Sequence, residues 1–90
     1  MYESAGESTN WFVYILRCVD GSFYTGITTD LVRRCEQHNA GTGARYTRSR
    51  LLVSIVYHEM QTTRSSALKL ELAIKALLRT EKETLIESII

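Results

Sequence analysis

The sequence predicts an α+β domain in which helices flank a three-stranded antiparallel sheet, in the order β-β-α-β-α-α. Two apolar runs flank the dipeptide Asp20-Gly21, which is typical of a β-hairpin. A capped helical segment follows, and a third apolar run, 51–60, precedes a second helical stripe. The 90 residues fit one small domain, which we place at 11–90 after a flexible polar tail at 1–10.

The hairpin register decides which side chains share a face of the sheet. A two-residue loop would put Tyr14 and Tyr24 on opposite faces, because strand side chains alternate. A three-residue loop, with Gly21 in the left-handed region, pairs Tyr14 with Gly26 and brings both tyrosines to one face. We therefore favour the longer loop, in which Gly26 leaves open space opposite the Tyr14 ring. The two strands are then expected at 11–19 and 22–27.

The first helix is expected over residues 28–41. Thr29 or Asp30 can cap its start, and Gly41 suits a left-handed position at its end. The segment that follows, 40–50, is rich in small residues and arginine and predicts a loop. The buried side of the helix is expected to contain Leu31, Val32 and Cys35.

The second helix is expected to start at a cap formed by Ser65 or Ser66 and to run to about residue 79. Thr80 and Glu83 fit a capping box, which predicts a last short helix. The apolar stripe of the second helix consists of Ala67, Leu70, Ile74, Leu77 and Leu78.

Composition argues against several classes of protein. No apolar run approaches the roughly 20 residues of a membrane span, so we expect no membrane association. The first ten residues lack the basic and apolar regions of a signal peptide, which favours a cytoplasmic setting. Cys18 and Cys35 form neither a zinc-ligand pattern nor a disulfide framework, and we expect both to be reduced and apolar.

Arginine is concentrated in one segment although the formal net charge is only +1. Guanidinium groups match phosphate oxygens well, so a cluster of one sign favours a polyanionic partner. A solvated basic face would have the same composition. Tyr46 lies among these arginines, which suits stacking on a base or sugar, although a core tyrosine is the commoner case. The cluster consists of Arg33, Arg34, Arg45, Arg48 and Arg50, against one acid, Glu36.

Three further residues on the predicted helices are candidates for a catalytic or metal-binding role. Arg34 and His38 are four residues apart and therefore share one helix face, although a solvated arginine and a histidine supporting the helix end would have the same spacing. Glu71 lies at the edge of the apolar stripe, where it can hold a metal ion at the rim of the core. The alternative is a surface ion pair with Lys75, four residues later.

Together these segments resemble the GIY-YIG endonuclease superfamily. That family has one strand bearing Gly-Ile-Tyr, a second bearing Tyr-Ile-Gly, a helix with an arginine and often a histidine, and a later helix with a glutamate. Here residues 12–14, Phe-Val-Tyr, stand for the first motif and residues 24–26, Tyr-Thr-Gly, for the second. Arg34 and His38 follow Tyr24 by ten and fourteen residues. The resemblance extends from residue 11 to about residue 86 and is closest to the small stand-alone bacterial (YhbQ-like) members.

The resemblance implies hydrolysis of a phosphodiester bond with one divalent metal ion. Glu71 would hold Mg²⁺ or Mn²⁺, and Arg34 would bind a non-bridging phosphate oxygen. Tyr14 is assigned as the base that takes a proton from water and Tyr24 as the residue that orients this water. Because a tyrosine with its usual pKa near 10 is a poor base at neutral pH, it needs a neighbour such as His38 to accept its proton.

The implied partner is DNA, in branched, flapped or single-stranded form, and the implied role is DNA repair or the processing of structured nucleic acid. An alternative is a nucleic-acid-binding module without catalysis, because many members carry an asparagine after the glutamate and this chain has none after Asn39. A third hypothesis is that the apolar C-terminal segment 85–90 packs on a protein partner or a second copy. Nucleic-acid contacts are expected from Arg33, Arg45, Tyr46, Arg48 and Lys75.

Overall fold

A computed structural model of the chain describes residues 10–88. Most of the expected tail at 1–10, and the last two residues of the segment 85–90, lie outside the described residues. The predicted order of elements is confirmed, and one short helix, α3, is added within the segment that was expected to be a loop. The elements are β2 (Trp11–Arg17), β3 (Phe23–Thr28), α2 (Leu31–Asn39), α3 (Arg45–Arg48), β4 (Ser54–Gln61), α4 (Arg64–Lys75) and α5 (Arg79–Glu87).

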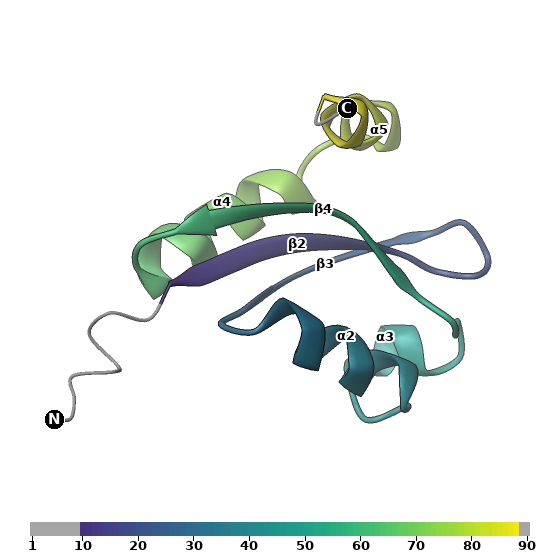
Figure 1. Cartoon of the computed structure of the whole chain (residues 1–90). Helices are drawn as coiled ribbons and strands as arrows, with labels where there is room; N and C mark the ends of the chain where they lie inside the picture. The colour runs from purple at the N-terminus through teal and green to yellow at the C-terminus, as the bar shows by residue number, and fades with distance from the viewer. Residues whose placement is uncertain (1–9, 89–90) are drawn as a thin grey trace, which may run out of the picture.

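The three strands form one antiparallel sheet in the order β3-β2-β4. Helices α2 and α3 lie on one side of this sheet, and α4 and α5 lie on the other (Figure 1). Side chains of β2 alternate between the two sides, as strand geometry requires. Val13 and Ile15 belong to the core beneath α4 and α5, whereas Tyr14 and Leu16 belong to the core beneath α2.

The predicted hairpin register is confirmed. Tyr14 is paired with Gly26, and the Cys18 N–H donates to the Ser22 carbonyl at 2.8 Å, which closes a three-residue loop. Gly21 has a φ of +84°, in the left-handed region that favours glycine. Tyr14 and Tyr24 therefore lie on the same face of the sheet.

The capping residues predicted for α2 are confirmed, although the helix itself, Leu31–Asn39, is shorter than the expected range 28–41. The Asp30 carboxylate accepts a hydrogen bond from the backbone N–H three residues later at 3.0 Å, and Gly41, with a φ of +80°, follows the helix end. Leu31 and Cys35 pack against the core that contains Tyr14. The expectation that Val32 belongs to the buried side is wrong, since its side chain is 67% exposed.

The expected start of the second long helix is wrong by two or three residues. Thr63, rather than Ser65 or Ser66, caps α4, because its hydroxyl accepts a hydrogen bond from the Ser66 N–H at 3.0 Å. A threonine three residues before the donor N–H satisfies one of the free N–H groups in the first turn of the helix. Ala67 and Ile74 of the predicted stripe are buried.

The expected end of this helix at about residue 79 is also wrong, because α4 ends at Lys75. Leu78 is 68% exposed and starts α5 instead of completing the apolar stripe. Its N–H donates to the Glu81 carboxylate at 2.8 Å, so the capping glutamate is Glu81 and not Glu83. Because the chain leaves the helical conformation between α4 and α5, α5 changes direction and packs Leu85 and Ile86 onto the core beneath α4. No helix between residues 10 and 88 is long and apolar enough to cross a membrane.

Candidate active site

A buried histidine joins three elements on the α2 side of the sheet. His38, at the end of α2, has no exposed surface. Its Nε2 lies 3.0 Å from the Tyr14 hydroxyl on β2, and its Nδ1 lies 2.8 Å from the Thr47 hydroxyl on α3. The Thr47 hydroxyl also donates to the Ala44 carbonyl at 2.9 Å. A continuous line of hydrogen bonds therefore runs from the sheet to α3 through both nitrogens of one imidazole.

Burial keeps His38 neutral. Loss of hydration and, to a smaller extent, the positive charge of Arg34 together lower its pKa from 6.5 to about 4. The imidazole is therefore uncharged at neutral pH, and one of its two nitrogens has a free lone pair.

The Tyr14 phenol is held in its protonated form. Burial raises the pKa of Tyr14 to about 12, opposed by a hydrogen bond from Arg34 and by the Arg34 charge. The charges of Tyr24 and Glu71 raise it further. The structure thus brings the predicted residues Tyr14, Tyr24 and His38 into contact. The charges of Arg34, on α2, and Glu71, on α4, also act on Tyr14.

Two glycines make room for the Tyr14–His38 pair. A β-carbon at Gly26 would lie 2.6 Å from the Tyr14 hydroxyl oxygen and 3.1 Å from a ring carbon of Tyr24. A β-carbon at Gly43 would lie 2.5 Å from His38 Nδ1 and 2.8 Å from the His38 Cα. Any larger residue at either position would displace the pair or the backbone next to it.

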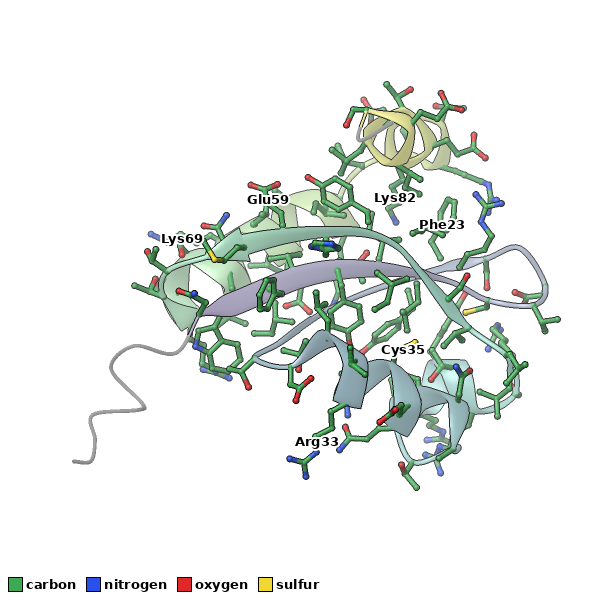
Figure 2. The ribbon with its side chains drawn as sticks, in the orientation of Figure 1. Phe23, Arg33, Cys35, Glu59, Lys69 and Lys82 are labelled. Atoms are coloured by element: carbon green, nitrogen blue, oxygen red, sulfur yellow. The ribbon has the colours of Figure 1, made fainter. Side chains whose placement is uncertain are left out.

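The two neighbouring arginines of α2 have different surroundings. Arg34 is half-buried, and its guanidinium donates to the Gln37 side-chain oxygen at 3.0 Å. Arg33 extends from α2 away from the sheet, whereas Cys35 faces the sheet (Figure 2). Arg34 is therefore the arginine that acts on Tyr14 and His38.

Aromatic rings form one wall of the site. The Tyr24 ring lies 5.2 Å from that of His38 and 6.2 Å from that of Tyr46, measured between centroids. The Arg50 guanidinium lies 4.0 Å from the Tyr46 ring centroid and donates to the Asp20 carboxylate at 3.1 Å. Tyr46, predicted as a stacking residue for nucleic acid, is thus packed between protein groups although 40% of it is exposed.

The remaining arginines of the predicted cluster are exposed. Arg33, Arg45 and Arg48 form no ion pair with any residue between 10 and 88. They lie on α2 and α3, the elements that hold His38 and Thr47. Arg50 differs from them, since its ion pair with Asp20 ties the end of α3 to the hairpin loop. The free positive charge next to the site therefore comes from α2 and α3.

Comparison with known proteins shows the family of the chain. The GIY-YIG catalytic domain matches residues 10–84. The chain belongs to the GIY-YIG family. A UPF0213 protein of Desulfotalea psychrophila is 54% identical over 79 residues, which cover 87% of this chain and 72% of the relative. A UPF0213 protein of Haloquadratum walsbyi is 51% identical over 76 residues, which cover 84% and 85% of the two chains.

Two solved structures share the GIY-YIG fold of this chain. The NMR structure of a UPF0213 protein from Bacillus halodurans is 44% identical, with a TM-score of 0.57 over 87% of this chain and 83% of the other. The NMR structure of a protein from E. faecalis is also 44% identical, with a TM-score of 0.61 over 89% and 85% of the two chains.

The GIY-YIG family raises the question of a metal ion, and the residues present fit one. The Glu71 side chain is 14% exposed and lies 3.3 Å from the Lys75 ammonium, so the ion pair expected as an alternative does form. Within residues 10–88 no three His, Cys, Asp or Glu side chains gather as a ligand set. Magnesium needs no such set, because it binds through one or two carboxylates and completes its shell with water and substrate phosphate.

Two parts of this GIY-YIG site were missed by sequence reasoning. Thr47 and Gly43 both contact His38, yet both lie in the segment predicted as a loop. No periodicity relates them to His38, and α3 is only four residues long. The available signal was a second glycine, Gly43, two residues after the helix-ending Gly41, where one glycine is sufficient to end a helix.

Proposed function

We propose that this GIY-YIG protein is a metal-dependent endonuclease that hydrolyses phosphodiester bonds in DNA. The observation that supports this most strongly is the buried 3.0 Å contact between the Tyr14 hydroxyl and His38 Nε2. A phenol with a pKa of about 12 is a poor base by itself. Contact with a neutral imidazole gives it a group to which its proton can pass.

In this mechanism Tyr14 takes a proton from the attacking water while its own proton moves to His38 Nε2. The water oxygen forms a bond to phosphorus, and the bond from phosphorus to the leaving oxygen breaks. Only 2% of Tyr14 is exposed, so the water reaches it beside the more exposed Tyr24, which suits Tyr24 for orienting that water. The leaving oxygen takes a proton from solvent water, and His38 releases its proton to solvent through Tyr14 when product leaves.

Arg34 links phosphate binding to the proton acceptor. Its half-buried guanidinium, held by Gln37, suits a non-bridging phosphate oxygen and the negative charge that develops there. The same positive charge lowers the pKa of His38 in the free protein. A bound phosphate offsets that charge, so substrate binding raises the proton affinity of His38 when it is needed.

Glu71 is the residue that would hold Mg²⁺ or Mn²⁺. When bound, the ion supplies polarisation of the phosphate and stabilisation of the leaving oxygen. The contribution of the chain is a largely buried carboxylate near Tyr14, next to an exposed lysine whose ammonium can move aside. Lys75 can then bind a flanking phosphate.

The substrate is proposed to be structured DNA, in branched, flapped or single-stranded form, as in DNA repair. A domain of this size has little surface for reading sequence, so affinity rests mainly on phosphate contacts and depends on salt concentration. The exposed residues Arg33, Arg45 and Arg48 supply those contacts beside the site.

The test is cleavage of labelled single-stranded, duplex, flapped and branched DNA with Mg²⁺, Mn²⁺ or a chelator. The Glu71→Gln variant is expected to lose cleavage while it still binds DNA. Glu83→Gln is the matched control, since it removes an equivalent i,i+4 ion pair, Arg79–Glu83, on α5. Metal-dependent cleavage that survives in the control only would support the nuclease. Binding without cleavage in the wild-type protein would support the non-catalytic binding module instead.

A further inference from the structure

We propose that Thr47 is a positioning residue that fixes the tautomer of His38, so that Nε2 presents a lone pair to Tyr14. This inference rests on the proposed function, in which Nε2 accepts the proton of Tyr14. Within residues 10–88 the Thr47 hydroxyl has hydrogen bonds to His38 and Ala44 and none to Tyr14 or Arg34, so it acts through His38. Both Thr47 and His38 have no exposed surface, so water does not compete for their hydrogen bonds.

Counting protons along the buried line gives the direction of each hydrogen bond. The Thr47 hydroxyl has one proton, which it donates to the Ala44 carbonyl at 2.9 Å. It must then accept from His38 Nδ1, 2.8 Å away, so Nδ1 carries the imidazole proton. Nε2 is left as an acceptor 3.0 Å from the Tyr14 hydroxyl. The protons of the Tyr14 hydroxyl, of His38 Nδ1 and of the Thr47 hydroxyl then each have one acceptor.

The reversed direction leaves groups without partners. If Thr47 donated to Nδ1, the imidazole proton would be on Nε2 and would point at the Tyr14 oxygen. Both groups at that contact would then be donors, and the Tyr14 proton would have no acceptor among the hydrogen bonds of residues 10–88. The first direction gives up only the long 3.4 Å contact from the part-buried Ala44 N–H to Nδ1, whereas the reversed direction leaves the fully buried Tyr14 hydroxyl without an acceptor. The buried donor without a partner costs more, so the first direction is the stable one.

A backbone group beside His38 makes the tautomer sensitive to Thr47. The Ala44 N–H points at His38 Nδ1 from 3.4 Å. With Thr47 present, the 2.8 Å hydrogen bond between Nδ1 and the Thr47 hydroxyl is stronger than this 3.4 Å contact with the Ala44 N–H. Without the hydroxyl, the Ala44 N–H is the polar neighbour that remains, and it favours a lone pair on Nδ1. The imidazole proton then moves to Nε2, where it blocks acceptance from Tyr14.

The fold holds Thr47 in place from both sides. Its N–H donates to the Ala44 carbonyl at 3.1 Å, and its carbonyl accepts from the Arg50 N–H at 2.9 Å. The Arg50 side chain donates to the Tyr46 carbonyl at 2.8 Å and pairs with Asp20 in the hairpin loop. These contacts hold the four-residue helix α3 in a fixed position. The Thr47 hydroxyl therefore stays next to His38 Nδ1, which it must do to set the tautomer.

The first test reads the tautomer directly, by NMR of protein with ¹⁵N-labelled histidine. Wild type and Thr47→Ser are expected to show His38 protonated on Nδ1. Thr47→Val, which keeps the side-chain shape without the hydroxyl, is expected to show protonation on Nε2. Thr47→Ala replaces it if the valine variant does not fold. The exposed His58 serves as an internal reference. A proton that stays on Nδ1 in the folded hydroxyl-free variant would overturn the proposal.

The second test separates this proposal from the proposed function. In the cleavage assay, Thr47→Val is expected to lower kcat about 10- to 100-fold with little change in KM, and Thr47→Ser is expected to restore it. Equal kcat in Thr47→Val and wild type, with the tautomer changed, would overturn the role of Thr47 in the reaction. If the wild-type protein cleaves nothing, the proposed function fails, whereas the NMR result still decides whether Thr47 sets the tautomer.

Discussion

The Tyr14 hydroxyl occupies the space that a β-carbon at Gly26 would need on the neighbouring strand, with the two atoms only 2.6 Å apart. The register of one hairpin therefore positions the phenol, and His38 then meets it from α2 at 3.0 Å. The glycine of the second motif has a steric role, which is to let the tyrosine of the first motif reach the histidine.

Gly26→Ala is expected to reduce cleavage more than tenfold and to lower the free energy of unfolding by about 1–3 kcal/mol, because the methyl group overpacks against Tyr14 and Tyr24. Gly41→Ala is the control. Gly41 has a φ of +80° with no atom near its missing β-carbon, so alanine there costs about 1–2 kcal/mol through backbone strain alone. Chemical denaturation and single-turnover cleavage measure the two effects. Equal cleavage by both variants at equal stability would contradict the steric role of Gly26.

The buried His38 predicts a loss of stability in mild acid. Its pKa is about 4 in the folded protein, below the value of 6.5 expected when unfolded. Between these values the unfolded chain binds a proton that the folded protein does not, so stability is complete above pH 6.5 and falls as the pH drops toward 4. One such group contributes about 1.4 kcal/mol per pH unit.

The measurement for His38 is urea denaturation between pH 4.5 and 6.5, in wild type and in His38→Gln. Carboxylates titrate alike in both proteins, so the difference in slope isolates His38. We expect a shallower slope in the variant, whatever its stability at pH 7. Equal slopes would show that His38 is accessible to protons in the folded state.

The arginines are expected to differ in their effect on nucleic-acid binding. Arg45→Ala and Arg48→Ala should each reduce the slope of log affinity against log salt concentration by about one, since each removes one phosphate contact. Arg50→Ala should leave the slope unchanged and lower stability, because Arg50 is engaged with Asp20 and Tyr46. Fluorescence anisotropy with labelled single-stranded DNA at several salt concentrations measures the affinity and therefore the slope for each variant. A reduced slope in Arg50→Ala alone would reverse the assignment.

The parts of the fold that the sequence predicts well are set by local rules. Strand alternation and the left-handed preference of Gly21 together determine the hairpin register, and through it the facing of Tyr14 and Gly26. Asp30 and Gly41 define α2 in the same way, by capping. These local rules position β2, β3 and α2, and they thereby bring Tyr14, Tyr24 and His38 together.

The parts that sequence reasoning misses depend on choices between similar neighbours or on contacts across the fold. Any of three nearby residues could cap α4 well: Thr63, Ser65 or Ser66. The helix starts after Thr63, where Ala67 packs into the core against the sheet. The residues Leu77 and Leu78 fit a continued apolar stripe, but the chain bends there so that α5 can reach the core. Thr47 has no local signal, because its partner His38 is nine residues away across an irregular segment.

The central claim is that the Tyr14 hydroxyl passes a proton between water and His38. The most direct measurement is the single-turnover cleavage rate of Tyr14→Phe with Mg²⁺, beside Tyr57→Phe. Tyr57 is a matched control, because it is also buried, its pKa is also raised to about 12, and its hydroxyl donates to Glu59 at 2.7 Å on the other side of the sheet. Tyr14→Phe is expected to bind DNA normally and to lose cleavage at least about 100-fold, while Tyr57→Phe is expected to cleave at the wild-type rate. Cleavage by Tyr14→Phe at the rate of Tyr57→Phe would contradict the claim.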